Sequence, residues 1–297
     1  MSSCLVLAHG GAGSDSAHSD GCETACELML NALEHGADAF EAARLGTRHL
    51  ENDPRFNAGT GANLLLDGQT VQMDAAIMAC DGRFGAIACI EGVQHPIDVA
   101  TKVVDTPHRL LVGPGATAFA RTHGFPDYDP VTPKARARHG AAWPKLRDGA
   151  GPWDIDLVRK NWNFDAPFPE HPGSDDGCDT VGVIVRDAAG RTASTSSTGG
   201  IRYMLRGRVG DSPLAGCGLY SMPGYSAAST GIGEAIAERF ASLRACEWMQ
   251  NGATPREAAD RALAMFSDDI AYGIIVLSEE GGAAACNRDM AWAIMSR

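Results

Sequence analysis

The chain has 297 residues, of which 44% are hydrophobic and 21% charged, so it is an ordinary globular protein with ample material for a core. Its net charge of −12 argues against nucleic acids and anionic membranes as its main partners. It contains no apolar run long enough to span a bilayer, and its first residues lack the basic start and apolar core of a signal peptide.

Nine cysteines are present, an odd number without the spacing of a zinc site or a redox pair. Cys22 and Cys26 are four residues apart, as on one face of a helix. We therefore expect reduced, mostly buried thiols and a cytoplasmic protein.

The first 123 residues contain both strand and helix patterns. A strand at about 4–8 leads into a glycine turn, His9-Gly-Gly-Ala-Gly13, and two stretches with helical spacing of apolar residues follow. Alternating patterns around Asp-Gly turns then predict a pair of strands. The elements expected after the first strand are helices at about 21–35, 38–51, 96–104 and 114–123, and strands at about 62–78, 83–91 and 109–113.

Residues 125–179 differ in character from what precedes them. They carry many prolines and glycines, a basic run at Lys134-Ala-Arg-Ala-Arg-His139, and little periodicity. A long surface loop is one interpretation, but such loops are uncommon inside a compact domain. We favour a flexible, partly disordered linker that is open to trimming.

Strand patterns return after residue 179. Because strands and helices occur in blocks rather than in strict alternation, the pattern favours a layered α+β protein over a doubly wound sheet. The expected elements are strands at about 180–187, 191–197, 271–278, 282–286 and 290–295, and helices at about 231–250 and 254–266.

Thr180 stands between a polar, glycine-containing stretch at 173–179 and the apolar strand that follows it. An internal threonine in this place is ordinarily just the start of a strand. Cleavage of the Asp179–Thr180 bond would instead expose a threonine with a hydroxyl nucleophile and a free α-amine that acts as its own base. Thr180 is therefore a candidate catalytic residue.

A second cluster, Thr195-Ser-Ser-Thr198-Gly-Gly200, ends the strand that pairs with the Thr180 strand through a hairpin. The hairpin returns the chain, so Thr198 is expected to lie near Thr180 and to hydrogen-bond its amine or hydroxyl. The ordinary alternative for a run of Ser and Thr is an edge strand.

A third cluster, Gly207-Arg208-Val-Gly-Asp211-Ser-Pro213, holds two opposite charges in a rigid turn. Arg208 suits a bidentate grip on a carboxylate, and Asp211 suits a grip on an ammonium group. Together they match the head group of an α-amino acid, although a surface ion pair is the ordinary alternative.

The fourth cluster, Ser229-Thr230-Gly-Ile-Gly233-Glu, precedes an expected helix. Its glycines would bare backbone N–H groups at a helix N-terminus, which suits a developing oxyanion. Capping of that helix by Thr230 or Ser229 is the structural alternative, and both roles can coexist. No phosphate-binding, dinucleotide-binding or zinc motif is present, which argues against a metal or nucleotide cofactor in catalysis.

These four clusters, in this order, resemble the motifs of the plant-type asparaginase and isoaspartyl peptidase family of N-terminal-nucleophile hydrolases. The resemblance covers most of the chain except residues 125–175. His9-Gly-Gly-Ala-Gly13 is similar to that family's first-strand motif, and residues 50–61 resemble its alkali-metal loop, followed by Met73-Asp-Ala-Ala-Ile-Met78. Glycosylasparaginases share the motifs of the second half but generally lack the His-Gly-Gly start.

The resemblance implies a role for each candidate residue. Thr180 would be the nucleophile and Thr198 its hydrogen-bonding partner, while Arg208 would bind the substrate α-carboxylate and Asp211 its α-amine. The Thr230 hydroxyl and the Gly231 N–H would form the oxyanion hole, Gly233 would line the site, and Asn57 would assist cleavage after Asp179. A structural sodium ion would be held by backbone carbonyls at Leu50, Glu51, Asp53, Phe56, Ala58 and Thr60.

The family's fold is a four-layer αββα sandwich, which implies one domain over 1–297 made as a precursor. Cleavage would leave an α subunit, 1–179, and a β subunit, 180–297, and the usual assembly is a homodimer of cleaved αβ heterodimers. The implied activity is hydrolysis of β-aspartyl peptides and L-asparagine to release L-aspartate, with no cofactor for catalysis.

Two departures concern the leaving group. Plant-type members usually have glycine before the nucleophile, whereas this chain has Asp179, as glycosylasparaginases do. Tyr203-Met204-Leu205 also replaces residues that are more polar in the family. A glycosylasparaginase-like amidase and an unprocessed, non-catalytic binding protein therefore remain as alternatives.

Overall fold

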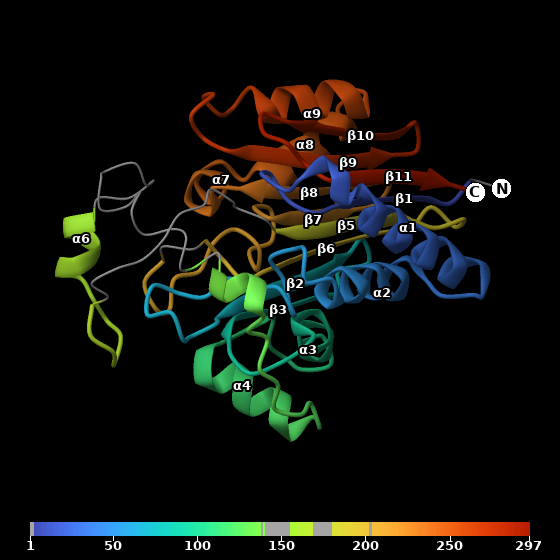
Figure 1. The fold of residues 1–297 in the computed structure, drawn as a ribbon. Coiled ribbons are helices and arrows are strands. Elements are labelled where there is room, and N and C mark those ends of the chain that lie inside the picture. Colours follow the sequence, from blue (N-terminus) through green and yellow to red (C-terminus); the bar gives the residue numbers. More distant parts are fainter. Residues whose placement is uncertain (1–2, 138, 140–154, 169–179, 202–203) are drawn as a thin grey trace.

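The structure, a computed structural model, describes residues 3–137, 139, 155–168, 180–201 and 204–297. Two β-sheets are stacked face to face, and helices cover the outer face of each (Figure 1). The larger sheet has seven strands in the order β11-β1-β5-β6-β2-β3-β4, and the smaller has four in the order β10-β9-β8-β7. The molecule is thus a four-layer αββα sandwich.

The first part of the chain supplies the helices that cover the larger sheet. Helix α1 packs on β1 and β11, α2 on β5 and β6, and α3 on β2 and β3. The described elements of this part are β1 (Leu5–His9), α1 (Ser19–Glu34), α2 (Ala39–Asn52), β2 (Met73–Ala79), β3 (Phe84–Ile90), α3 (Pro96–Val103), β4 (Leu110–Val112), α4 (Gly113–Thr122) and α6 (Ile155–Lys160).

The second part supplies the centre of the larger sheet and all of the smaller one. Helices α8 and α9 cover the outer face of the smaller sheet. The elements are β5 (Val181–Arg186), β6 (Thr192–Thr198), β7 (Leu219–Met222), β8 (Tyr225–Gly231), α7 (Gly233–Arg239), α8 (Ala241–Gln250), α9 (Pro255–Leu263), β9 (Tyr272–Ser278), β10 (Gly281–Cys286) and β11 (Trp292–Ser296).

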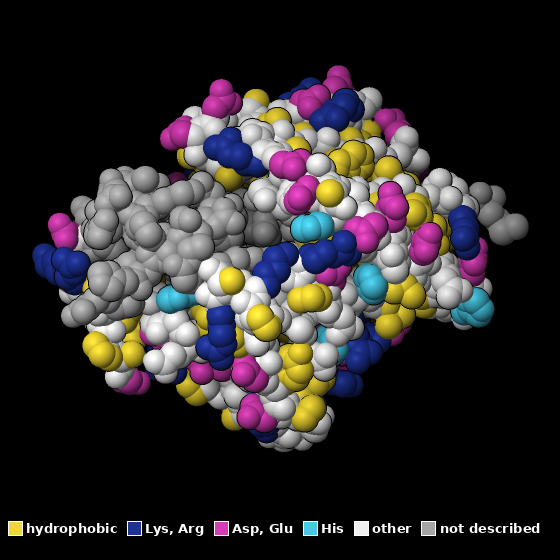
Figure 2. Space-filling model, in the orientation of Figure 1, with side chains coloured by type: hydrophobic (Ala, Val, Ile, Leu, Met, Phe, Trp, Pro, Cys, Tyr) yellow, Lys and Arg dark blue, Asp and Glu magenta, His cyan; other side chains and the backbone are white. Residues whose placement is uncertain are grey.

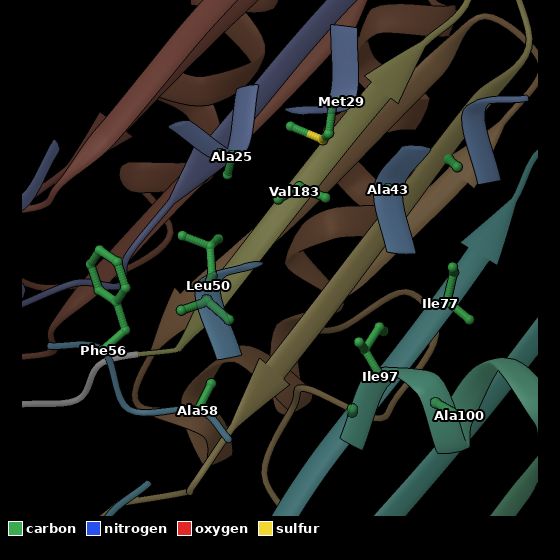
Figure 3. Close-up of a cluster of buried hydrophobic side chains, with 14 of the residues drawn as sticks. Ala25, Met29, Ala43, Leu50, Phe56, Ala58, Ile77, Ile97, Ala100 and Val183 are labelled. Carbon is green, nitrogen blue, oxygen red and sulfur yellow. The ribbon is translucent and has the colours of Figure 1, made fainter. Parts of the chain in front are cut away.

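Apolar clusters join the layers. One lies between α1, α2, α3 and the larger sheet, where Met29, Leu50 and Val183 meet (Figure 3). A second lies under α8 and α9, and a third joins the two sheets. On the face formed by α1 and α2, charged side chains of both signs surround single apolar ones (Figure 2). Among the residues that the structure describes, no helix has the length and apolarity needed to cross a membrane.

The structure differs from the expected elements in several places. The strand expected over 62–78 spans only Met73–Ala79, because the Asp67 carboxylate accepts hydrogen bonds from the backbone of residues 69 and 70 and closes a turn there. The helix expected over 231–250 is two helices, because Phe240 between them has a left-handed backbone with φ +51°.

One hairpin was not expected at all. Strands β7 and β8 pair across Pro223 and Gly224, but β8 consists largely of Ser, Ala, Thr and Gly, which have little of the β-branched or aromatic character of a recognisable strand. Part of the stretch expected to be an irregular linker forms helix α6. Residues 140–154 and 169–179 of that stretch lie outside the described residues.

Strand β6 is central and completely buried, not the edge strand that its hydroxyl side chains allow as an alternative. Most of its hydroxyls form hydrogen bonds to neighbouring layers: Thr195 pairs with Thr47 of α2, and Ser194 accepts from Ser221 of β7, whereas the Ser196 Oγ has no partner among the described residues. Burial of so many polar groups is favourable only when most of them find a partner. The cluster is therefore built into the centre of the sandwich.

Candidate active site

The β5–β6 hairpin brings Thr180 and Thr198 together. Val181 at the start of β5 pairs with Ser197 of β6, which places the preceding Thr180 beside Thr198. The Thr180 Oγ1 donates a hydrogen bond of 3.2 Å to the Thr198 Oγ1, which also accepts one of 3.0 Å from the Gly200 N–H. Both threonines are buried. The proximity expected from the hairpin is thus present.

The position of His9 explains why residue 182, two positions after Thr180, is a glycine. The two residues are paired across β5 and β1, and a Cβ atom at Gly182 would collide with the His9 imidazole Nε2. His9 is fully buried, and burial lowers its pKa to about 3, so the ring is neutral. The glycine turn after His9 in turn reaches the other sheet, where the Ala12 N–H donates to the Thr230 Oγ1 over 3.1 Å.

A pocket opens at Thr180 and collects residues from all four sequence clusters. Glycine is frequent around it, which leaves backbone atoms accessible to a small ligand. The pocket is lined by Thr180, Thr198, Gly200, Ile201, Arg208, Gly210, Asp211, Ser212, Gly231 and Gly233. The structure therefore brings together the candidate nucleophile, its partner and both charged residues of the proposed head-group clamp.

Asp211 is a buried carboxylate whose Oδ2 atom has no hydrogen-bond partner among the residues that the structure describes. Burial raises its pKa to about 7, although the nearby Arg208 guanidinium favours the charged form. An unsatisfied buried carboxylate is costly unless a cation or donor reaches it. An ammonium group that enters the pocket would therefore give this carboxylate a positively charged hydrogen-bond donor.

Arg208 is held in place by Glu234, which lies in the first turn of α7. The Arg208 Nε and Nη2 donate to the two Glu234 carboxylate oxygens over 2.8 and 2.7 Å, a bidentate ion pair. Glycines surround the guanidinium: Cβ atoms at Gly210 and Gly233 would each approach it to 2.7 Å. The sequence analysis assigned no role to Glu234, because the two residues are 26 positions apart.

Asp74 is a second residue of the site that the sequence analysis did not single out. It lies on β2, is buried, and accepts a 2.8 Å hydrogen bond from the Cys89 N–H at a bulge where Cys89 has φ +50°. Burial raises the pKa of Asp74 to about 6, and the charge of Arg208 acts in the opposite direction. The sequence contains one signal that points to Asp74: it is a single acidic residue inside an otherwise apolar strand.

Asn57 lies behind the Thr198 end of β6. Its Nδ2 donates to the Gly200 carbonyl over 2.7 Å, and its own carbonyl accepts from the Gly199 N–H over 2.9 Å. A Cβ atom at Gly199 would collide with the Asn57 Oδ1. Asp179 lies outside the described residues, so the expected approach of Asn57 to the scissile peptide stays a prediction.

The fourth cluster is a strand end, not the capped helix start that the sequence allows as an alternative. Ser229 and Thr230 lie within β8, and the residue before α7 is Ile232, which provides no side-chain cap. Gly231 ends β8 with φ +136° and lines the pocket, where a Cβ atom would collide with the Ala271 carbonyl. Thr230 is fully buried beside it and does not line the pocket.

The loop that follows α2 exposes backbone carbonyls in a compact turn. The carbonyls of Leu50, Glu51 and Asp53 each accept one backbone hydrogen bond, from Asp53, Thr60 and Phe56 respectively. Each carbonyl has a second lone pair available for a cation. The Glu51 carboxylate instead points into the core, where it accepts from the Ser197 Oγ over 2.6 Å. Backbone carbonyl oxygens are the kind of donor that a hard cation prefers.

Two stacked sheets between helix layers, with a threonine at the head of a central strand, define an N-terminal-nucleophile hydrolase fold. The chain belongs to the asparaginase family, whose model matches residues 2–297. It is 35% identical to a plant-type L-asparaginase of Pyrococcus abyssi over 98% of this chain and 95% of the relative. The four-layer fold expected from the sequence is therefore confirmed.

Two further relatives differ in their named activities. An isoaspartyl peptidase/L-asparaginase of Danio rerio is 33% identical over 97% of this chain and 91% of its own length. An N(4)-(beta-N-acetylglucosaminyl)-L-asparaginase of Elizabethkingia miricola is 31% identical, over 84% of this chain and 71% of its own length. The similarity to the first of these two covers more of both chains.

The raised pKa of Asp211 predicts how stability depends on pH. Because the pKa rises from 3.8 to about 7 on folding, the folded protein binds the proton more tightly, and ionisation opposes folding between these values. Asp211→Asn removes this effect. The free energy of unfolding of the variant, relative to that of the parent, should therefore increase as pH rises from 4.5 to 7. The gain is at most about 1.4 kcal/mol per pH unit.

Urea unfolding of both proteins at several pH values measures this difference. Asp105→Asn is the control, since Asp105 is exposed and its removal takes away one charge without touching the pocket. A parallel pH dependence for Asp211→Asn and its parent would show that the carboxylate ionises freely in the folded protein.

Proposed function

We propose that this protein is a self-processing threonine hydrolase that cleaves β-aspartyl peptides and L-asparagine and releases L-aspartate. The observation that carries the proposal is the hydrogen bond between Thr180 and Thr198 in a pocket shared with Arg208 and Asp211. The named activities of the Pyrococcus abyssi and Danio rerio relatives support the same reaction class.

Recognition rests on the two charges that face the pocket. Arg208 binds the α-carboxylate through the edge of its guanidinium that Glu234 leaves open, since Glu234 occupies only Nε and Nη2 on one side. Asp211 binds the α-ammonium group, which supplies the partner that its Oδ2 lacks. A substrate must therefore carry both α substituents free.

Maturation begins when the Thr180 Oγ attacks the carbonyl carbon of Asp179. The Asp179 carboxylate takes up the hydroxyl proton and passes it to the Thr180 nitrogen as the peptide C–N bond breaks. The new C–O bond replaces that C–N bond, and the protonated Thr180 nitrogen becomes a free amine. Water then hydrolyses the ester and leaves a carboxylate at Asp179. Asn57 contributes indirectly, because its hydrogen bonds fix Gly199 and Gly200, which follow Thr198.

In turnover the α-amine of Thr180 acts as the base. Its reference pKa of about 7.7–8 makes it partly neutral near pH 7, so it accepts the proton of the Thr180 Oγ as that oxygen attacks the side-chain carbonyl of the substrate. The protonated amine then gives the proton to the leaving amine as the C–N bond breaks. Water hydrolyses the β-aspartyl ester and releases aspartate.

The Gly231 N–H, at the pocket lining, and the Thr230 hydroxyl, buried directly behind it, would together stabilise the oxyanion. In the structure the Thr230 Oγ1 accepts a hydrogen bond from Ala12, which leaves its own hydroxyl hydrogen available for donation. Loss of one donor from such a hole typically costs roughly 2.7–4 kcal/mol of barrier. The Ala12 contact thus links the glycine turn of the first strand to the transition state.

A sodium ion bound in the loop at 50–60, which contains Asn57, would supply a fixed positive charge that makes this loop more rigid. Carbonyls of Leu50, Glu51, Asp53, Phe56, Ala58 and Thr60 would hold it. The midpoint of thermal unfolding of desalted protein should rise on addition of sodium chloride but not of equimolar tetramethylammonium chloride. Equal effects of the two salts would argue against the site.

We also propose a cytoplasmic protein that assembles as a homodimer of cleaved αβ heterodimers. The described cysteines support a reducing compartment, since all eight are free and five are buried. Sedimentation of the processed protein against the Thr180→Ala precursor tests the assembly.

Processing and turnover are separated by two substitutions. The mature protein should contain a fragment of 118 residues that begins at Thr180, visible by intact mass under denaturing conditions. Thr180→Ala should abolish both this fragment and aspartate release, since the nucleophile is lost. Arg208→Ala should retain the cut but lose turnover, because only the substrate needs the guanidinium.

A protein that stays full length after prolonged incubation and releases no aspartate would support the non-catalytic alternative. Rates on a β-aspartyl dipeptide, L-asparagine and N-acetylglucosaminyl-asparagine then distinguish the isoaspartyl peptidase from the glycosylasparaginase-like alternative, which the Elizabethkingia miricola relative represents.

Glu234→Gln tests whether the ion pair orients Arg208. The glutamine keeps the size and one acceptor oxygen but loses the charge and one hydrogen bond, so the guanidinium gains freedom. We expect KM for L-asparagine to rise roughly tenfold with little change in kcat, equivalent to about 1.4 kcal/mol of lost substrate binding. Glu238→Gln, on the same helix but paired with Arg239, is the control. A fall in kcat at unchanged KM would contradict an orienting role.

A further inference from the structure

Residues 155–168, which we name the arm, pack against the body beside the active site. Val158 and Phe164 are buried in one apolar cluster with Ile201 and Met204. Trp162 packs against Phe164 with tilted rings at a centroid distance of 4.4 Å, and it donates its Nε1–H to the Ala166 carbonyl over 2.7 Å. The arm therefore has its own side-chain packing, and its helix α6 lies at one side of the molecule (Figure 1).

Hydrogen bonds connect the arm to the loop that carries Arg208 and Asp211, the two charged residues that we call the clamp. The Asn163 side chain donates to the Arg206 carbonyl over 2.8 Å and accepts from the Arg206 N–H over 3.1 Å, as a neighbouring strand would. Arg206 stands two residues before Arg208. This reciprocal pair fixes the backbone direction at the entrance to the clamp.

The same cluster reaches the substrate pocket from the other side. Ile201 lines the pocket together with Thr180, and it is the single large apolar side chain among the described lining residues. Met204 packs over Gly200, where a Cβ atom would collide with the Met204 sulfur. Phe164 and Val158 of the arm thus support the side chains that form this wall.

Both charged residues of the pocket already have a role in binding the substrate. Arg208 and Asp211 hold the α substituents of the substrate, and Thr180 faces the carbonyl that is attacked. The leaving group must then be accommodated by the remaining lining residues, of which Ile201 is the one with a large apolar side chain. An apolar wall there favours apolar groups and leaves a charged one without a partner.

We infer that the arm stays bound to the mature enzyme and supports an apolar wall, formed by Ile201 and packed from behind by Met204, that selects β-aspartyl amides with apolar leaving groups. This inference rests on the proposed function, because it describes the leaving-group side of the same site. It also assigns a specificity role to part of the stretch between the two proposed subunits. Trimming is then confined to residues outside the arm.

Retention of the arm is tested by cutting the chain before it. A specific protease sequence replaces residues 144–150, the protein is allowed to mature, and the cut is then made. Native mass spectrometry should find the fragment that carries the arm still bound, and denaturing conditions should release it. Loss of the fragment with unchanged kinetics would overturn the inference.

Specificity is tested with β-aspartyl-leucine, β-aspartyl-lysine and L-asparagine. We expect kcat/KM to favour the leucine over the lysine substrate by roughly tenfold. Asn163→Ala and Phe164→Ala should reduce this preference several-fold, with much less effect on L-asparagine, whose leaving group is ammonia. Asn161→Ala is the matched control, because its side chain bonds only within the arm, to the Leu157 carbonyl.

The outcomes separate the two proposals. If no β-aspartyl substrate yields aspartate, the proposed function is wrong. If aspartate is released but the leucine and lysine substrates react equally, or the preference survives Asn163→Ala, the inference alone is wrong. Because the Asn163 side chain lies on an exposed residue, this variant is expected to fold even where Phe164→Ala does not.

Discussion

The pairing register of β5 and β6 is the constraint on which the rest of the site depends. Val181 pairs with Ser197, so Thr180 and Thr198 meet at the open end of a central hairpin. A shift of one residue would turn every side chain of β5 to the opposite face. Glycine at 182 allows β5 to pair with β1 on its other side, since His9 occupies the space that a side chain would need. The nucleophile is thus positioned by packing several residues away from it.

Charge balance is the second constraint. One guanidinium, Arg208, lies among three carboxylates from three separate elements, Asp74, Asp211 and Glu234. Burial raises the pKa of Asp74 and of Asp211, which means that the empty pocket holds their negative charge at a cost. A zwitterionic head group brings one carboxylate for Arg208 and one ammonium for Asp211. The pocket therefore favours amino acids with both α groups free over neutral amides of similar shape.

The sequence predicted those parts of the site that depend on local order. Thr180, Thr198, Arg208 and Asp211 occur in short motifs, and a hairpin can be recognised from its own turn. Glu234 and Asp74 were missed as partners of Arg208, because their contacts depend on how distant elements meet. The β7–β8 hairpin was missed because small residues become a strand only when neighbouring layers cover them.

A cut before Thr180 would leave two parts of the chain that are joined by strand pairing within the larger sheet. Strand β1, from the first part, lies between β5 and β11 of the second part and forms backbone ladders with both. Strand β2 likewise pairs with β6 along its whole length. Loss of one peptide bond leaves these ladders and the shared apolar core intact. The architecture thus allows an internal threonine to become a chain terminus without loss of the fold, and the site can be assembled before the nucleophile's amine is freed.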